Sequence, residues 1–168
     1  MHDEIRPPAG ADPSAPGTGV SDDELVARAT RAREHAYVPY SGFAVGAALL
    51  TRSGEVFTGC NVENASYGLT VCAERVAIFN AVARGHREFR ALAVVADTEG
   101  LCPPCGACRQ VMAEFGDFRV ILANLRGDRT STLVSELLPA AFHFPPPGGA
   151  TGEPPGGATC DARWTRAR

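Results

Sequence analysis

Cysteines dominate the residues of this chain that could carry out chemistry. The segment LCPPCGACRQ holds Cys102, Cys105 and Cys108 at two successive C-x-x-C spacings. Cys72 lies thirty residues before the first of them and is followed two positions later by Glu74. Thiolates at such spacings serve as a redox dithiol, as ligands of an iron–sulfur cluster, or as ligands of zinc. The local spacing alone does not choose among these three chemistries.

Glu74 favours zinc over the other two. A catalytic zinc site needs three protein ligands and an open position for water, and Cys72, Cys105 and Cys108 supply that number. A carboxylate two residues beyond a ligand lies close to the metal and stays free to pass a proton. A redox dithiol gives no use to Cys72, and both it and a cluster leave Glu74 without a role. A closed structural zinc site would need Cys102, whose mobility the adjacent prolines limit.

Two predicted helix starts could bring the thiols together. Helices are predicted from Cys72 to Gly85 and from near Cys105 to Gly116. Unpaired N–H groups at a helix start favour thiolate over thiol, and Cys108 lies one turn beyond Cys105 on the same helix face. Two facing helix N-termini would therefore place three thiolates at one point. The predicted apolar face of the first of these helices is Val76, Ile78, Phe79 and Val82.

Strands and a third helix must hold these helix starts in place. Segments 43–51 and 56–62 predict a hairpin around a glycine-containing turn. The continuous apolar run 91–97 predicts a strand buried on both faces, and 119–124 predicts a further strand. The alternation of strands and helices indicates an α/β fold, a three-layer α-β-α arrangement with a mixed sheet of about five strands.

The third helix opens the predicted domain. Ser21 and Glu24 form a capping-box pattern that starts a helix running to about Ala36, before Pro39. Its predicted buried stripe is Leu25, Ala29, Ala32 and Ala36.

Composition bounds the domain and its partners. With 168 residues, 45% of them hydrophobic, one domain is expected over 21–142, flanked by Pro/Gly-rich tails at 1–20 and 143–168. The net charge of −3 provides no basic field for nucleic acid, so a small-molecule partner is favoured. No secretory leader and no membrane-spanning run is recognised, which predicts a cytoplasmic protein with reduced or metal-bound cysteines. The sequence assigns no role to Cys60 or Cys160.

A family resemblance sharpens these alternatives. CAE followed by PCGAC resembles the C/H-x-E…P-C-x-x-C signature of zinc-dependent nucleoside and nucleobase deaminases. Pro104 precedes Cys105, so only the later C-x-x-C pair matches and Cys102 falls outside the motif. The segments YSGFAVGAALLT, GCNVENASYGLTVCAERVAIFNAV, PCGACRQV and ELLPAAF are similar to the small homotetrameric cytidine deaminases. The resemblance covers essentially all of 21–142.

The resemblance implies an activity and a metal site. Cys72, Cys105 and Cys108 would bind one Zn²⁺ per chain, and cytidine and deoxycytidine would be hydrolysed to uridine and deoxyuridine with release of ammonia, as in pyrimidine salvage. Glu74 would be the catalytic residue, which protonates ring N3 and carries the proton of water to the departing amino group. Arg75 would hydrogen-bond ligand sulfurs and offset the excess negative charge of three thiolates.

The resemblance also implies contacts with the nucleoside. Asn61 and Glu63, on one face of a strand end, would bind the sugar 3′-OH. Phe43 would stack on the pyrimidine, and the backbone N–H of Ala73 would reach the base carbonyl. Without the resemblance, Phe43 could simply be a core residue, and the pattern of Asn61 and Glu63 would favour an ordinary polar strand end over a binding site.

Oligomerisation is implied as well. Tyr67 and Phe142 match aromatic positions that reach a neighbouring subunit's active site, which predicts a homotetramer with shared active sites. The 26 residues after Phe142 depart from many relatives, which end soon after this motif. The alternatives left open are a polynucleotide or tRNA deaminase, a deaminase of a modified cytosine such as a nucleoside antibiotic, and a non-catalytic zinc module.

Overall fold

A five-stranded mixed sheet forms the centre of the protein. The computed structural model describes residues 19–144, so most of both predicted tails, and Cys160, lie outside the described residues. The strand order is β2-β1-β3-β4-β5, with β3 and β4 parallel and the other pairs antiparallel. The strands are β1 Val45–Thr51, β2 Val56–Cys60, β3 Phe89–Ala96, β4 Arg119–Asn124 and β5 Arg129–Leu133. The predicted mixed sheet is confirmed.

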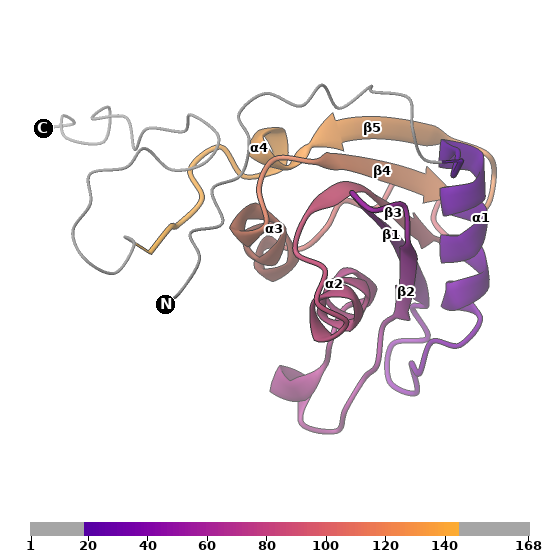
Figure 1. The fold of residues 1–168 in the computed structure, drawn as a ribbon. Helices are drawn as coiled ribbons and strands as arrows, with labels where there is room; N and C mark the ends of the chain where they lie inside the picture. The colour runs from indigo at the N-terminus through magenta and orange to yellow at the C-terminus, as the bar shows by residue number, and fades with distance from the viewer. Residues whose placement is uncertain (1–18, 145–168) are drawn as a thin grey trace, which may run out of the picture.

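Helices cover both faces of this sheet. The helix α1 (Asp22–Arg33) lies on one face, and α2 (Ala73–Ala83) and α3 (Gly106–Glu114) lie on the other, as Figure 1 shows. The described residues also contain two short helices, η1 (Tyr67–Leu69) and α4 (Val134–Leu137). The three-layer α-β-α prediction is therefore correct. Within 19–144, no helix has the length and apolar character needed to cross a membrane.

Alternation along the strands builds two separate cores. In β1, Ala47 and Leu49 belong to the core under α2 and α3, whereas Ala48 and Leu50 belong to the core under α1. The same alternation recurs in β3 and β4, so each central strand is buried on both faces. The sheet thus forms a rigid layer from which the helices on either side take their positions.

The start of α1 matches the sequence prediction and its end does not. The Ser21 hydroxyl caps the helix by accepting a hydrogen bond from the Glu24 N–H at 3.2 Å. The helix ends at Arg33, three residues before the predicted Ala36. Of the predicted buried stripe, Leu25 and Ala29 are fully buried, while Ala32 and Ala36 are only partly buried.

The predicted apolar face of α2 is wrong for Phe79, which is 49% exposed. The helix is instead buried through Ile78 and an alanine stripe, Ala73, Ala77 and Ala81. Small residues are required because α2 approaches the backbone of β2 closely. A Cβ on Gly59 would lie 2.5 Å from the Ala77 nitrogen. This close approach fixes the N-terminus of α2, where Cys72 lies, against the sheet.

Candidate metal centre and nucleoside site

The starts of α2 and α3 bring three cysteine thiols together, as the sequence predicts. Cys72 is the N-cap of α2, Cys105 is the N-cap of α3, and Cys108 lies in the first turn of α3. Their sulfur atoms all lie within 4.8 Å of one another. Cys108 is buried, Cys72 is partly buried and Cys105 is exposed, so the cluster is open on one side.

The spacing of the thiols fits a tetrahedral zinc ion. Two thiolates bound to Zn²⁺ at ~2.3 Å with tetrahedral geometry lie ~3.8 Å apart. The Cys72 and Cys105 sulfurs are 3.8 Å apart. Three sulfur ligands open on one side also match the donor set of a catalytic zinc site, which keeps one position for water. Cys102 does not belong to the three-thiol cluster.

Hydrogen bonds within the cluster already favour thiolate at one position. A hydrogen bond from Cys108 lowers the pKa of Cys72 to about 5, and Arg75 acts in the same direction. The same contact with Cys72 raises the pKa of Cys108, as does its burial. The proton between the two thiols therefore stays on Cys108, and a bound metal would displace it, because zinc binds the thiolate form.

Arg75 lies beside the thiols. Its Nη2 donates to the Cys72 sulfur at 3.4 Å and to the Thr70 carbonyl oxygen at 3.3 Å. Its Nε is buried and has no hydrogen-bond partner among the described residues. A guanidinium in this place offsets part of the negative charge that gathers when several thiolates meet.

Glu74 lies in the first turn of α2 and is 5% exposed. Burial raises the pKa of this carboxyl, and the negative charge of Cys72 raises it further. A hydrogen bond with Cys108 and the charge of Arg75 act in the opposite direction. Such a carboxyl can hold a proton closer to neutral pH than an exposed glutamate can.

Ala73 is the first residue of α2 and is fully buried. The N–H groups of the first helical turn have no acceptor within their own helix. The contact predicted between Ala73 and the base would therefore use a backbone N–H that has no acceptor within α2.

Asn61 and Glu63 follow β2 and hold the loop that precedes β1. The Asn61 Oδ1 accepts a hydrogen bond from the Val45 N–H at 2.8 Å, and its Nδ2 donates to the Phe43 carbonyl oxygen at 2.8 Å. The Glu63 carboxylate accepts from the backbone N–H groups of Tyr40 and Ser41. The sequence predicted this polar pair, but not that both side chains brace the segment that carries Phe43.

Tyr67 and Phe142 are exposed in the single chain, by 74% and 67%. Tyr67 opens η1, and its ring contacts the ring of Tyr40 with centroids 5.8 Å apart. The backbone of Phe142 is held on α3, because Gln110 Nε2 donates to the Phe142 carbonyl oxygen at 2.7 Å and Gln110 Oε1 accepts from its N–H at 3.2 Å. Gln110 lies two residues after Cys108, so these hydrogen bonds hold the segment around Phe142 close to the thiol cluster.

Sequence reasoning missed the residues that arrange this site. Arg109 Nε donates to the Pro104 carbonyl oxygen at 2.7 Å, and its Nη1 donates to the Leu137 carbonyl oxygen at 3.0 Å. It therefore ties the segment before Cys105 to α4. The one sequence signal for these contacts was the Arg-Gln pair that directly follows Cys108.

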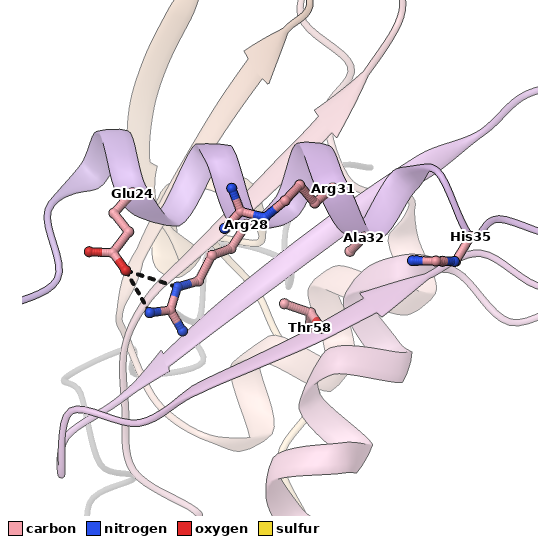
Figure 2. A pocket seen from close by; sticks show the side chains of 6 residues that line it. All are labelled: Glu24, Arg28, Arg31, Ala32, His35 and Thr58. Carbon is pink, nitrogen blue, oxygen red and sulfur yellow. Dashed lines mark hydrogen bonds and ion pairs between the residues drawn. The ribbon is translucent and has the colours of Figure 1, made fainter.

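A separate pocket lies on the opposite face of the sheet. It is lined by α1 and by Thr58 of β2, as Figure 2 shows. Its charged side chains include Arg28, whose guanidinium is already paired with Glu24. The pocket holds none of the catalytic, metal-ligating or substrate-binding residues that the sequence predicted.

Comparisons with known proteins agree with the geometry of the thiol cluster. Residues 20–124 match a family model described as the cytidine and deoxycytidylate deaminase zinc-binding region. The chain is 59% identical over 122 residues to a cytidine deaminase of Sporosarcina psychrophila, covering 71% of this chain and 90% of that protein. It is 61% identical over 120 residues to a cytidine deaminase of Halalkalibacterium halodurans, covering 70% and 91%.

Solved structures give the same result. The crystal structure of cytidine deaminase from Burkholderia pseudomallei is 56% identical to the chain, with a TM-score of 0.72. The match covers 73% of this chain and 100% of that one.

Proposed function

Because the chain belongs to the cytidine and deoxycytidylate deaminase family, we propose that it hydrolyses cytidine and deoxycytidine to uridine and deoxyuridine with release of ammonia. The observation that carries the proposal is the meeting of three thiols at two helix N-termini beside a buried carboxyl. The reaction serves pyrimidine salvage, and we place it in the cytoplasm, where reducing conditions keep thiols available.

Cys72, Cys105 and Cys108 would hold the zinc ion of this family. Zinc, when bound, supplies a Lewis acid that lowers the pKa of water toward ~7. The 3.8 Å separation of the Cys72 and Cys105 sulfurs supports this ligand set. Arg75, through its contact with the Cys72 sulfur, limits the negative charge at the site and so preserves the acidity of the metal.

Glu74 would carry the protons of the reaction. Its carboxyl donates a proton to ring N3, transfers one proton of the attacking water to the amino group, and regains a proton from the new C4 hydroxyl as the carbonyl forms. The C4–O bond forms, the C4–N bond breaks, and ammonia leaves. Burial, which raises the pKa of Glu74, suits this role because the carboxyl must both give and take a proton near neutral pH.

Asn61 and Glu63 would bind a sugar hydroxyl. The hydrogen bonds described above use one of the two N–H groups of Asn61 Nδ2 and leave the other for a ligand. The Glu63 carboxylate accepts three hydrogen bonds and has capacity for about four. A hydroxyl group that accepts from the amide and donates to the carboxylate satisfies both side chains. Phe43, on the loop they brace, would stack on the base, and the Ala73 N–H would bind its carbonyl.

Exposed aromatic rings support a homotetramer with shared active sites. Tyr67, Phe142 and Phe79 each expose about half of their surface or more, which is costly in water for rings of this size. We assign Tyr67 and Phe142 to the active site of a neighbouring subunit, where they would be covered. Light scattering on the purified chain tests the assembly, and a monomer that deaminates cytidine at full rate contradicts it.

Replacing Glu74 by Gln tests the catalytic assignment. The substitution keeps the shape of the side chain and removes its proton, so cytidine-dependent ammonia release should fall by about 10²–10⁴-fold. Glu114→Gln, at the exposed end of α3, is the matched control and should leave the rate unchanged. Near-parental ammonia release by Glu74→Gln rejects the assignment.

Metal analysis tests the ligand set with two neighbouring cysteines. Cys102→Ala should keep about one zinc per chain, because a three-ligand site needs no fourth thiol. Cys105→Ala should lose zinc. Loss of metal from Cys102→Ala would mean that the ligands include a different cysteine.

A further inference from the structure

The loop before β1 and the strand end after β2 form one hydrogen-bonded unit. Three donors meet at the carboxylate of Glu63. Two of them are backbone N–H groups, those of Tyr40 at 2.9 Å and Ser41 at 3.3 Å, and both reach Oε2. The third is the Ser41 hydroxyl, which donates to Oε1 at 2.5 Å.

Ser41 is the junction of this unit. While its hydroxyl donates to Glu63, the same oxygen accepts a hydrogen bond from the Phe43 N–H at 2.9 Å. Gly42, between these two residues, has φ 66°, a backbone conformation that residues with a Cβ rarely adopt. The loop therefore turns tightly around the Ser41 hydroxyl. One side chain links the carboxylate of Glu63 to the backbone of Phe43.

The two oxygens of Glu63 differ in what they can still accept. A carboxylate oxygen offers about two lone-pair positions. Both positions of Oε2 are taken by backbone N–H groups, whereas among residues 19–144 only Ser41 donates to Oε1. The hydroxyl of Ser41 thus fixes the rotation of the carboxylate and leaves one acceptor position at Oε1.

We propose that Ser41 is a positioning residue for sugar recognition, which orients the free acceptor of Glu63 and holds Phe43 in the same unit. The inference rests on the proposed function, since it presumes a nucleoside whose hydroxyl binds Glu63. Ser41 acts through Glu63, and needs no contact of its own with the substrate. The hydrogen bonds that Ser41 makes also lower the pKa of Glu63, which keeps the carboxylate ionised.

Steady-state kinetics of Ser41→Ala test the proposal. Loss of the hydroxyl should raise KM for cytidine about tenfold, because the carboxylate loses one partner and its fixed rotation. The value of kcat should stay within about threefold, because the thiol cluster and Glu74 are untouched. Ser41→Thr, which keeps the hydroxyl, should restore KM. With 3′-deoxycytidine, which lacks the hydroxyl assigned to Glu63, Ser41→Ala should raise KM less than with cytidine, because only the hold on Phe43 is lost.

Ser135→Ala is the matched control. Ser135, in α4, is also an exposed serine. Its hydroxyl donates to the carboxylate of Asp117 at 2.9 Å. Its KM for cytidine should equal the parental value. If Ser41→Ala melts without a cooperative transition, Ser41→Cys, which has nearly the same shape and is a weak donor, takes its place with the same expected rise in KM.

Three outcomes overturn the proposal. These are an unchanged KM for cytidine, a rise in KM that is equal for cytidine and 3′-deoxycytidine, and a loss confined to kcat. Failure of the proposed function gives a different result, because the parental protein would then release no ammonia from cytidine.

Discussion

Replacing Gly59 by alanine should weaken zinc binding, although the glycine lies in β2. A Cβ at this position would lie 2.5 Å from the Ala77 nitrogen and 2.6 Å from the Ala73 carbonyl oxygen. Both are backbone atoms of α2, so no side-chain rotation can relieve the contact. Ordinary van der Waals contact begins at 3.4 Å, so the helix must move by about 0.9 Å (3.4 − 2.5).

A shift of this size exceeds what a metal site tolerates. Ligand distances in metal sites hold to within about ±0.2 Å, and Cys72 directly precedes Ala73. Moving the start of α2 away from the sheet changes the 3.8 Å separation between the Cys72 and Cys105 sulfurs. We expect zinc affinity to fall about 10–100-fold, with a further loss of about 1–3 kcal/mol in the free energy of unfolding.

Gly46 offers a matched control on the opposite face. A Cβ there would lie 2.0 Å from the Ala29 carbonyl oxygen of α1, so Gly46→Ala should destabilise the fold at least as much. Because α1 carries none of the thiols, zinc affinity should stay within about threefold of the parental value. Chelator competition measures the affinity at a temperature where circular dichroism shows both variants folded. Parental affinity in folded Gly59→Ala, or an equal loss in Gly46→Ala, refutes the reasoning.

Two further predictions concern the edges of the site. Gln110→Ala removes both hydrogen bonds to the Phe142 backbone, so kcat/KM for cytidine should fall about tenfold if Phe142 completes a neighbouring site. Asn80→Ala, which removes an exposed amide bonded to the Thr58 carbonyl oxygen, is its control, and equal kcat/KM in both variants contradicts the role of Phe142. Hydrogen bonds from Ser41 and Tyr40 lower the pKa of Glu63, so its carboxylate stays ionised as pH falls through the usual glutamate range. In the parental protein, KM for cytidine should therefore rise only when the pH falls below that range. In Ser41→Ala, the rise in KM should begin at a higher pH. The same pH dependence of KM in both proteins would contradict this.

Local signals explain why much of the fold was predictable. The capping box at Ser21 and the glycine-containing turn of the hairpin act within a few residues, so sequence patterns report them directly. The apolar run of β3 is buried on both faces as predicted, because the parallel strand pair must be covered by helices on each side. The meeting of Cys72 with Cys105 followed from two helix starts, each recognisable on its own.

Features that depend on tertiary contact were missed. The edge strand β5 is mostly exposed and shows no apolar alternation, so its segment RTSTL gave no strand signal. Phe79 fits an apolar helix face by type, yet it is 49% exposed, and Ala73, Val76 and Ala77 form the face of α2 that approaches Gly59. The contact of Ser41 with Glu63 spans 22 residues and that of Gln110 with Phe142 spans 32, which no local pattern encodes.

The cysteine pair also has a mechanical consequence for the whole chain. Cys72 and Cys105 are 33 residues apart, and the chain between them contains all of α2 and all of β3, the central strand of the sheet. An ion held by both thiols closes this segment into a loop, as a disulfide would. Closing a loop of this length removes about 3–4 kcal/mol of chain entropy from the unfolded state. The ion that activates water would then also act as a cross-link, so that a chelator removes catalysis and resistance to unfolding together.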